Sequence, residues 1–167
     1  MVDVVSSATP RSGGEADLLD LFLGKCGGSI GEISALLLLI GGLYLVVRRV
    51  ISWHIPVSYL GTVALISFVF PKGEGFFDWR FMLLELLSGG LMLGAIFMAT
   101  DYVTSPITKN GRLIFGVGCG LLTVFLRYFG SYPEGVSFAI LVMNCLVYYI
   151  DKLTRPRVFG GGGRVKQ

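Results

Sequence analysis

The chain has 167 residues, of which 53% are hydrophobic and 15% are charged. Soluble domains carry about 25% charged residues, so this composition and the long apolar runs predict an integral membrane protein with several spans. The net charge of +3 is too small to indicate a nucleic-acid partner. The three scattered cysteines and the one histidine argue against a zinc or iron–sulfur site made by this chain alone.

The chain opens with a short polar segment, residues 3–10. Its Ser6, Ser7 and Thr9 hydroxyls have little bulk around them, and Pro10 favours an extended backbone at Thr9. Such a segment suits an enzyme that modifies a hydroxyl, because the acceptor can be held in an extended conformation. The alternative is a disordered polar terminus that precedes a membrane domain.

Residues 30–158 are predicted to form an all-α bundle of about five transmembrane helices, because backbone that faces lipid must satisfy its own hydrogen bonds. Before this domain, residues 1–29 form an outer segment that ends in a short interfacial or re-entrant piece. After it, residues 159–167 form a flexible cytoplasmic tail. The predicted spans are residues 30–47, 56–70, 80–100, 113–129 and 136–150.

Two of the predicted spans carry glycines about one helical turn apart. Gly90 and Gly94 lie in the third span, and Gly116 and Gly120 lie in the fourth. Small residues at this spacing allow the backbones of two helices to approach closely. We therefore expect these glycines at contacts between helices.

The distribution of Lys and Arg predicts the orientation in the membrane. With five spans, nine basic residues lie on the side of the C-terminus and five lie on the side of the N-terminus. The richer side is expected to face the cytoplasm, which places Thr9 outside. The nine are Arg48, Arg49, Lys109, Arg112, Lys152, Arg155, Arg157, Arg164 and Lys166, and the five are Arg11, Lys25, Lys72, Arg80 and Arg127.

Three acidic residues, Glu32, Glu85 and Asp101, lie within or at the ends of predicted spans. An ionisable group at such a position is costly and is a candidate for function. Glu85 lies deepest, and its alternative is to reach the interface or to bond to a neighbouring helix. Arg127 has the same two alternatives, whereas Asp151 is expected to pair with nearby basic residues. No hydrolytic triad is predicted, and no catalytic residue is assigned.

The segment from Asp3 to Thr9 resembles the flavin-attachment motif of membrane-bound flavoproteins. Asp3, Ser6 and Ala8 match the motif, whereas Ser7 stands where glycine is usual. The resemblance implies that a flavin transferase attaches FMN to Thr9 through a phosphoester. Ser7 leaves this acceptor intact, and it is expected to slow the modification.

Four further segments are similar to RnfD, a membrane subunit of the Rnf ion-translocating electron-transport complex. They follow the order of that family and, with the motif, extend the resemblance to about residue 159. The flavin motif is shared with NqrB, the related subunit of the sodium-pumping NADH:quinone reductase, but Thr-Ser-Pro and Thr-Arg-Pro-Arg in two of the segments favour RnfD. The segments are residues 28–42, 94–106, 127–135 and 151–157.

The resemblance implies an FMN-carrying subunit, not catalytic alone, in a complex that couples electron transfer between ferredoxin and NAD to sodium or proton translocation. The implied partners are the other Rnf subunits, a flavin transferase and membrane lipid. The implied location is the inner membrane, with the C-terminus in the cytoplasm. Glu32, Glu85 and Asp101 are the candidates for an ion path.

Two departures from the family bear on this interpretation. Tyr102 stands where the family usually has proline after the aspartate, which changes the local turn. The chain also resembles only the C-terminal half of the family's subunit, as one half of a fold made of two repeats. The alternatives are a passive channel or solute transporter without a redox role, the quinone reductase subunit, and a nonfunctional fragment.

Overall fold

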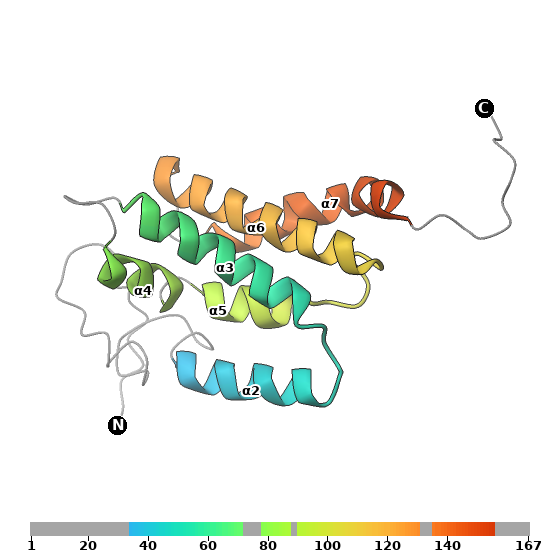
Figure 1. Ribbon diagram of the computed structural model, residues 1–167, viewed down its shortest axis with the longest axis horizontal. Coiled ribbons are helices and arrows are strands. Elements are labelled where there is room, and N and C mark those ends of the chain that lie inside the picture. The colour runs from blue at the N-terminus through green and yellow to red at the C-terminus, as the bar shows by residue number, and fades with distance from the viewer. Residues whose placement is uncertain (1–33, 72–77, 88–89, 131–134, 156–167) are drawn as a thin grey trace, which may run out of the picture.

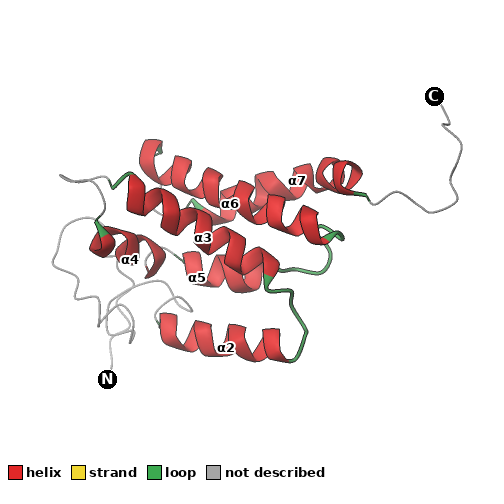
Figure 2. Cartoon of the chain, viewed as in Figure 1, coloured by secondary structure: helices red, strands yellow, loops and turns green. Residues whose placement is uncertain are grey.

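The computed structural model describes residues 34–71, 78–87, 90–130 and 135–155. Every regular element in these ranges is a helix (Figure 2). The all-helical prediction is therefore confirmed for the described residues. The elements are α2 (Ala35–Val47), α3 (His54–Val69), α4 (Trp79–Leu87), α5 (Leu91–Leu93), the π-helix η2 (Gly94–Met98), α6 (Lys109–Phe129) and α7 (Val136–Thr154).

Two of these helices, α6 and α7, are long and apolar enough to cross a membrane, with 21 and 19 residues. The bent pair formed by α4 and residues 91–98 provides a third span if it counts as one crossing. The other two apolar helices, α2 and α3, are shorter, with 13 and 16 residues. The structure supports an integral membrane protein, and the full set of five spans stays a prediction.

The predicted third span, 80–100, is broken where a continuous helix was expected. Gly90 has φ 64°, in the left-handed region, and it is the N-cap of α5. A right-handed helix cannot continue through that conformation, which glycine adopts at little cost. The axes of α4 and residues 91–98 consequently differ by 66°. Gly90 thus breaks the span, and it is Gly94 that lies at a helix contact, because an added Cβ there would clash with Val136 Cγ1.

The predicted role of Gly116 and Gly120 is confirmed at the contact between α3 and α6. A Cβ on Gly116 would clash with Ser58 Oγ, and one on Gly120 would lie 2.7 Å from Thr62 Cβ. The two helices can approach this closely only because both positions lack a side chain. One turn further along α6, a buried hydrogen bond of 2.6 Å joins Tyr59 Oη and Thr123 Oγ1.

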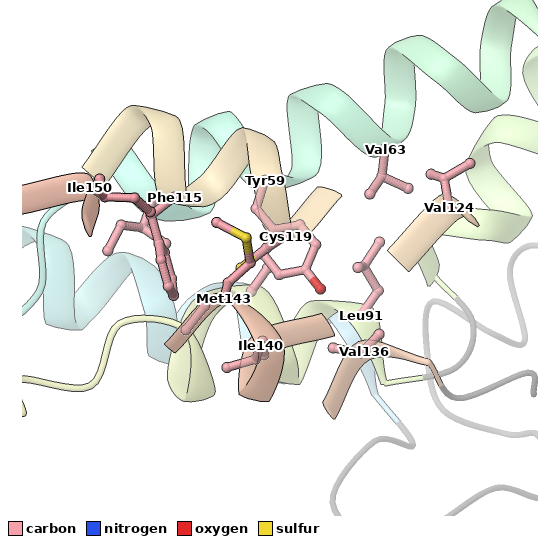
Figure 3. Close-up of a cluster of buried hydrophobic side chains, with 13 residues drawn as sticks. Tyr59, Val63, Leu91, Phe115, Cys119, Val124, Val136, Ile140, Met143 and Ile150 are labelled. Atoms are coloured by element: carbon pink, nitrogen blue, oxygen red, sulfur yellow. The ribbon is translucent and has the colours of Figure 1, made fainter. Parts of the chain in front are cut away.

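The core lies among α3, α5, η2, α6 and α7 (Figure 3). In lipid the burial of apolar side chains against one another gains little from water exclusion, so close packing stabilises this core. Gly118 illustrates the density, because a Cβ there would clash with Met143 Cε on α7. The buried apolar members are Ile55, Tyr59, Val63, Leu91, Ala95, Ala99, Phe115, Cys119, Val124, Val136, Ile140, Met143 and Ile150.

Successive segments run in opposite directions along the bundle (Figure 1). We call the end where α2 and α7 finish and α3 and α6 begin the basic end. The opposite end, where α3 and α6 finish, is the ion-pair end. Polar bonds between segments close each end: Thr108 Oγ1 and Thr154 Oγ1 lie 2.5 Å apart at the basic end, and Tyr128 Oη donates to Phe70 O over 2.6 Å at the ion-pair end.

The two ends differ in charge as the Lys and Arg distribution predicts. Of the eight described basic residues, six lie at the basic end and two at the ion-pair end. The prediction for Asp151, that it pairs with basic residues, gives way to a different contact: its carboxylate accepts a hydrogen bond of 3.1 Å from the N–H of Ile107. The six are Arg48, Arg49, Lys109, Arg112, Lys152 and Arg155, and the two are Arg80 and Arg127.

Candidate functional site

The predicted flavin-attachment residues lie outside the described residues, as does Glu32, one of the three candidates for an ion path. The attachment of FMN therefore stays a prediction. Glu85 and Asp101 are described, and the structure places them in different surroundings. The residues outside the described ranges are Asp3, Ser6, Ser7, Ala8, Thr9 and Glu32.

Glu85 forms a buried ion pair with Arg127. Glu85 Oε2 lies 2.6 Å from Arg127 Nη1, and the side chains of Glu85 and Arg127 are 2% and 0% exposed. The same nitrogen donates to the backbone oxygen of Glu85 over 2.7 Å. Of the two alternatives for each residue, the bond to a neighbouring helix is therefore the observed one.

This pair joins α4 to the last turn of α6 across 42 residues of sequence. A cation near the C-terminus of a helix is favoured by the helix dipole. A carboxylate in an apolar interior also needs a partner, because an isolated buried charge is very costly. The geometry makes Glu85 and Arg127 an internally neutralised pair that fixes α4 against α6.

Asp101, in contrast, is exposed and lies in a turn after η2 at the basic end. Its carboxylate accepts a hydrogen bond of 3.4 Å from Thr104 Oγ1, and its backbone oxygen accepts one of 3.2 Å from the Ser105 N–H. Along α6, the distance from the basic end at Arg112 to the pair at Arg127 is about 22 Å at 1.5 Å per residue. Glu85 and Asp101 thus do not form one site.

A polar pocket of about 490 Å³ opens at the basic end, where the sequence alone predicted none. We call it the basic-end pocket. Its lining comes from the end of α2, the start of α3, the turn after η2 and the first turn of α6. Among its described lining residues there are two arginines and no Asp or Glu. The polar lining side chains are those of Arg49, Ser52, Trp53, His54, Thr100, Tyr102, Ser105 and Arg112.

Arg49 enters this lining through an unusual backbone conformation. It is the only described non-glycine residue with positive φ, at 56°. The N–H of Val50 bonds to Leu45 O and the N–H of Arg49 bonds to Val46 O, both over 2.9 Å, which is the Schellman ending of a helix. Glycine usually occupies the position of Arg49 in this motif, because a left-handed conformation costs other residues about 1–2 kcal/mol.

Tyr102 and Arg112 fix the opposite wall of the basic-end pocket. The Tyr102 hydroxyl donates to Val50 O, which ties the turn after η2 to the α2–α3 loop. Arg112 Nε donates to Pro106 O over 2.9 Å. The departure from proline at position 102 therefore supplies both a ring that lines the pocket and a hydroxyl that joins two loops.

Comparison with known proteins gives concordant findings. The sequence model described as the NQR2, RnfD, RnfE family matches residues 1–160. The chain is 44% identical to the subunit designated D of the Na⁺-translocating ferredoxin:NAD⁺ oxidoreductase complex of Acetobacterium woodii, over 96% of this chain and 51% of that protein. It is 49% identical to the subunit of the same letter in the ion-translocating oxidoreductase complex of Stutzerimonas stutzeri, over 96% of this chain and 45% of that protein.

A third relative is the corresponding subunit of the proton-translocating ferredoxin:NAD⁺ oxidoreductase complex of Clostridium ljungdahlii, which is 43% identical over 95% of this chain and 52% of that protein. The chain thus spans about half the length of the curated relatives it matches. These similarities extend over both the described helices and the N-terminal segment that holds the flavin-motif resemblance.

Proposed function

The chain belongs to the NQR2, RnfD, RnfE family, and from this premise we propose that it is the FMN-carrying membrane subunit of an ion-translocating oxidoreductase complex. The complex would transfer electrons between ferredoxin and NAD and move ions across the membrane. The observation that carries this proposal is the family match over residues 1–160, which includes the polar segment at the start of the chain. The other subunits of the complex are its proposed partners.

The ion is proposed only as sodium or a proton. The relative from Acetobacterium woodii is named for sodium, and the relative from Clostridium ljungdahlii is named for protons. Their identities to this chain are 44% and 43%, so overall similarity does not favour one ion.

Within this proposal Thr9 is the acceptor for FMN, through a phosphoester made by a flavin transferase. A covalently held flavin supplies one-electron redox chemistry at a fixed place, while the protein sets its position and surroundings. The sequence from Asp3 to Ala8 supplies the small, extended surroundings that such a transferase needs. The outer location of Thr9 is part of the same proposal, with the basic end in the cytoplasm.

The proposed ion path involves Glu32, Glu85 and Asp101. Because Glu85 and Asp101 lie at opposite ends of the bundle, they would act at different points of a path. Asp101 is the exposed carboxylate, whereas Glu85 is paired with Arg127. An Asp101→Asn variant of the complex is expected to lower ion transport per electron transferred, and unchanged transport would remove Asp101 from the path.

The proposal is tested by expressing the full chain with a flavin transferase and observing flavin fluorescence on a denaturing gel. Fluorescence that survives denaturation indicates a covalent flavin. Thr9→Ala is expected to abolish it, and Ser7→Gly, which restores the usual motif, is expected to keep or increase it. Equal fluorescence in Thr9→Ala would show that the acceptor is another residue, and no fluorescence in any variant would contradict the flavin role.

A further inference from the structure

We propose that the basic-end pocket binds the phosphate headgroup of an anionic phospholipid, one of whose acyl chains lies in an apolar groove between α2 and α3. This proposal does not rest on the redox role of the chain. It follows from the charge of the pocket, from the conformation of Arg49 and from the continuity of the pocket with the groove.

The headgroup site combines three features that favour a phosphate. Arg49 and Arg112 both line the pocket, and guanidinium groups bind phosphate oxygens through paired N–H donors. The N-terminus of α3 also lies in the lining, and its N-cap, Trp53, makes no side-chain hydrogen bond to it. The first N–H groups of α3 and its dipole are therefore available to an anion.

The starts of α2 and α6 differ in this respect. Ser34 caps α2 through the N–H of Leu37, and Thr108 caps α6 through the N–H of Gly111. Both caps satisfy N–H groups that would otherwise need a partner. The start of α3 thus lacks the side-chain cap of these neighbours at the same place where two arginines line a pocket.

The conformation of Arg49 is the observation that points most directly to a ligand. Arginine occupies the left-handed position of a Schellman motif that glycine would adopt without strain. Strain of this kind persists where the side chain has a function, and binding an anion in the pocket is the function that its location supports.

The groove identifies the anion as part of a lipid. An apolar cavity of about 200 Å³ lies between α2 and α3, and its wall includes Leu43, Val57 and Leu60. Val46 and Ile51 line both the groove and the basic-end pocket, so the two are continuous. A molecule with an anionic head and an apolar tail fits this arrangement, and basic pockets between transmembrane helices on the cytoplasmic side recognise such lipids.

The headgroup is tested by native mass spectrometry of the full chain in detergent, titrated with palmitoyl-oleoyl phosphatidylglycerol and, separately, with the zwitterionic palmitoyl-oleoyl phosphatidylcholine. We expect tighter binding of phosphatidylglycerol and a loss of about tenfold in its affinity in Arg49→Gln. The matched control is Arg48→Gln, because Arg48 is also exposed but does not line the pocket. Equal affinity for both lipids, or equal losses in both variants, would overturn the proposal.

The tail is tested with a second matched pair on α2. Leu43 and Leu37 are 66% and 67% exposed, but only Leu43 lines the groove. Leu43→Trp is expected to lower the affinity for phosphatidylglycerol about tenfold by filling the groove, whereas Leu37→Trp is expected to leave it unchanged. Inorganic phosphate is the third probe. If it displaces the lipid at millimolar concentration while Leu43→Trp has no effect, the site binds a free anion and the lipid assignment is wrong.

Discussion

The two ends of the helix bundle treat their arginines in opposite ways. At the ion-pair end, Arg127 is buried and neutralised by Glu85, a partner from within the chain. At the basic end, Arg49 and Arg112 line an open pocket whose described lining holds no acidic residue. The comparison shows a charge that the fold satisfies internally and charges that it presents to something else, so the first should govern stability and the second should govern binding.

The largest expected effect is the removal of one member of the buried pair. Glu85→Gln leaves the Arg127 guanidinium without a counter-ion, and we expect a loss of about 3–5 kcal/mol in the free energy of unfolding. Equilibrium unfolding in mixed SDS and detergent micelles measures it. The double variant Glu85→Met with Arg127→Met should recover most of the loss, and a single-variant cost below about 1 kcal/mol would contradict the structural role of the pair.

A smaller loss is expected where α3 and α6 meet between the two ends. Gly116→Ala places a Cβ against Ser58 and the backbone oxygen of Ile55, which should cost about 1–3 kcal/mol. Gly61→Ala is the matched control on α3, because no atom lies within 4 Å of its added Cβ. The same unfolding measurement should show Gly61→Ala as neutral or stabilising, and equal effects of the two changes would rule out the close contact.

At the basic end, we expect a substitution that raises stability and lowers binding. Arg49→Gly removes the left-handed strain, so the free energy of unfolding should rise by about 1 kcal/mol, while the affinity for phosphatidylglycerol falls. Arg48→Gly, at a residue with φ −74°, should instead be destabilising. If Arg49→Gly is destabilising, the conformation assigned to Arg49 is wrong.

The smallest expected effect concerns the wall of the basic-end pocket. Tyr102→Phe removes the hydrogen bond to Val50 O and should cost about 1 kcal/mol or less, because Tyr102 is 74% exposed. The loss should appear as faster amide hydrogen exchange in the α2–α3 loop, residues 48–53, with no change near Arg127. Unchanged exchange in that loop would indicate that the tyrosine does not hold it.

The sequence was a good guide to the helices and a poor guide to what joins them. The fourth and fifth predicted spans, 113–129 and 136–150, coincide with most of α6 and α7 because long apolar runs have few alternatives in lipid. Periodicity also identified Gly116 and Gly120 as contact residues. The break at Gly90 was not predicted, because packing selects whether a glycine stays helical or takes positive φ.

The candidate sites depended on information that a linear pattern does not carry. Glu85 and Arg127 were each recognised as costly groups, but their pairing across 42 residues of sequence requires the packing of α4 on α6. The basic-end pocket draws on segments from Val46 to Arg112. Its one signal in the sequence was the grouping of Arg49 and Arg112 on the same side of the membrane, which indicated orientation and not a pocket.

The proposed covalent flavin in the outer segment is tested most directly by the intact mass of the chain after co-expression with a flavin transferase. We expect an increase by one FMN attached through its phosphate, absent in Thr9→Ala. Fragmentation of the labelled chain should place the added mass on Thr9. An unmodified mass in the wild-type chain, or an unchanged adduct in Thr9→Ala, would contradict the assignment.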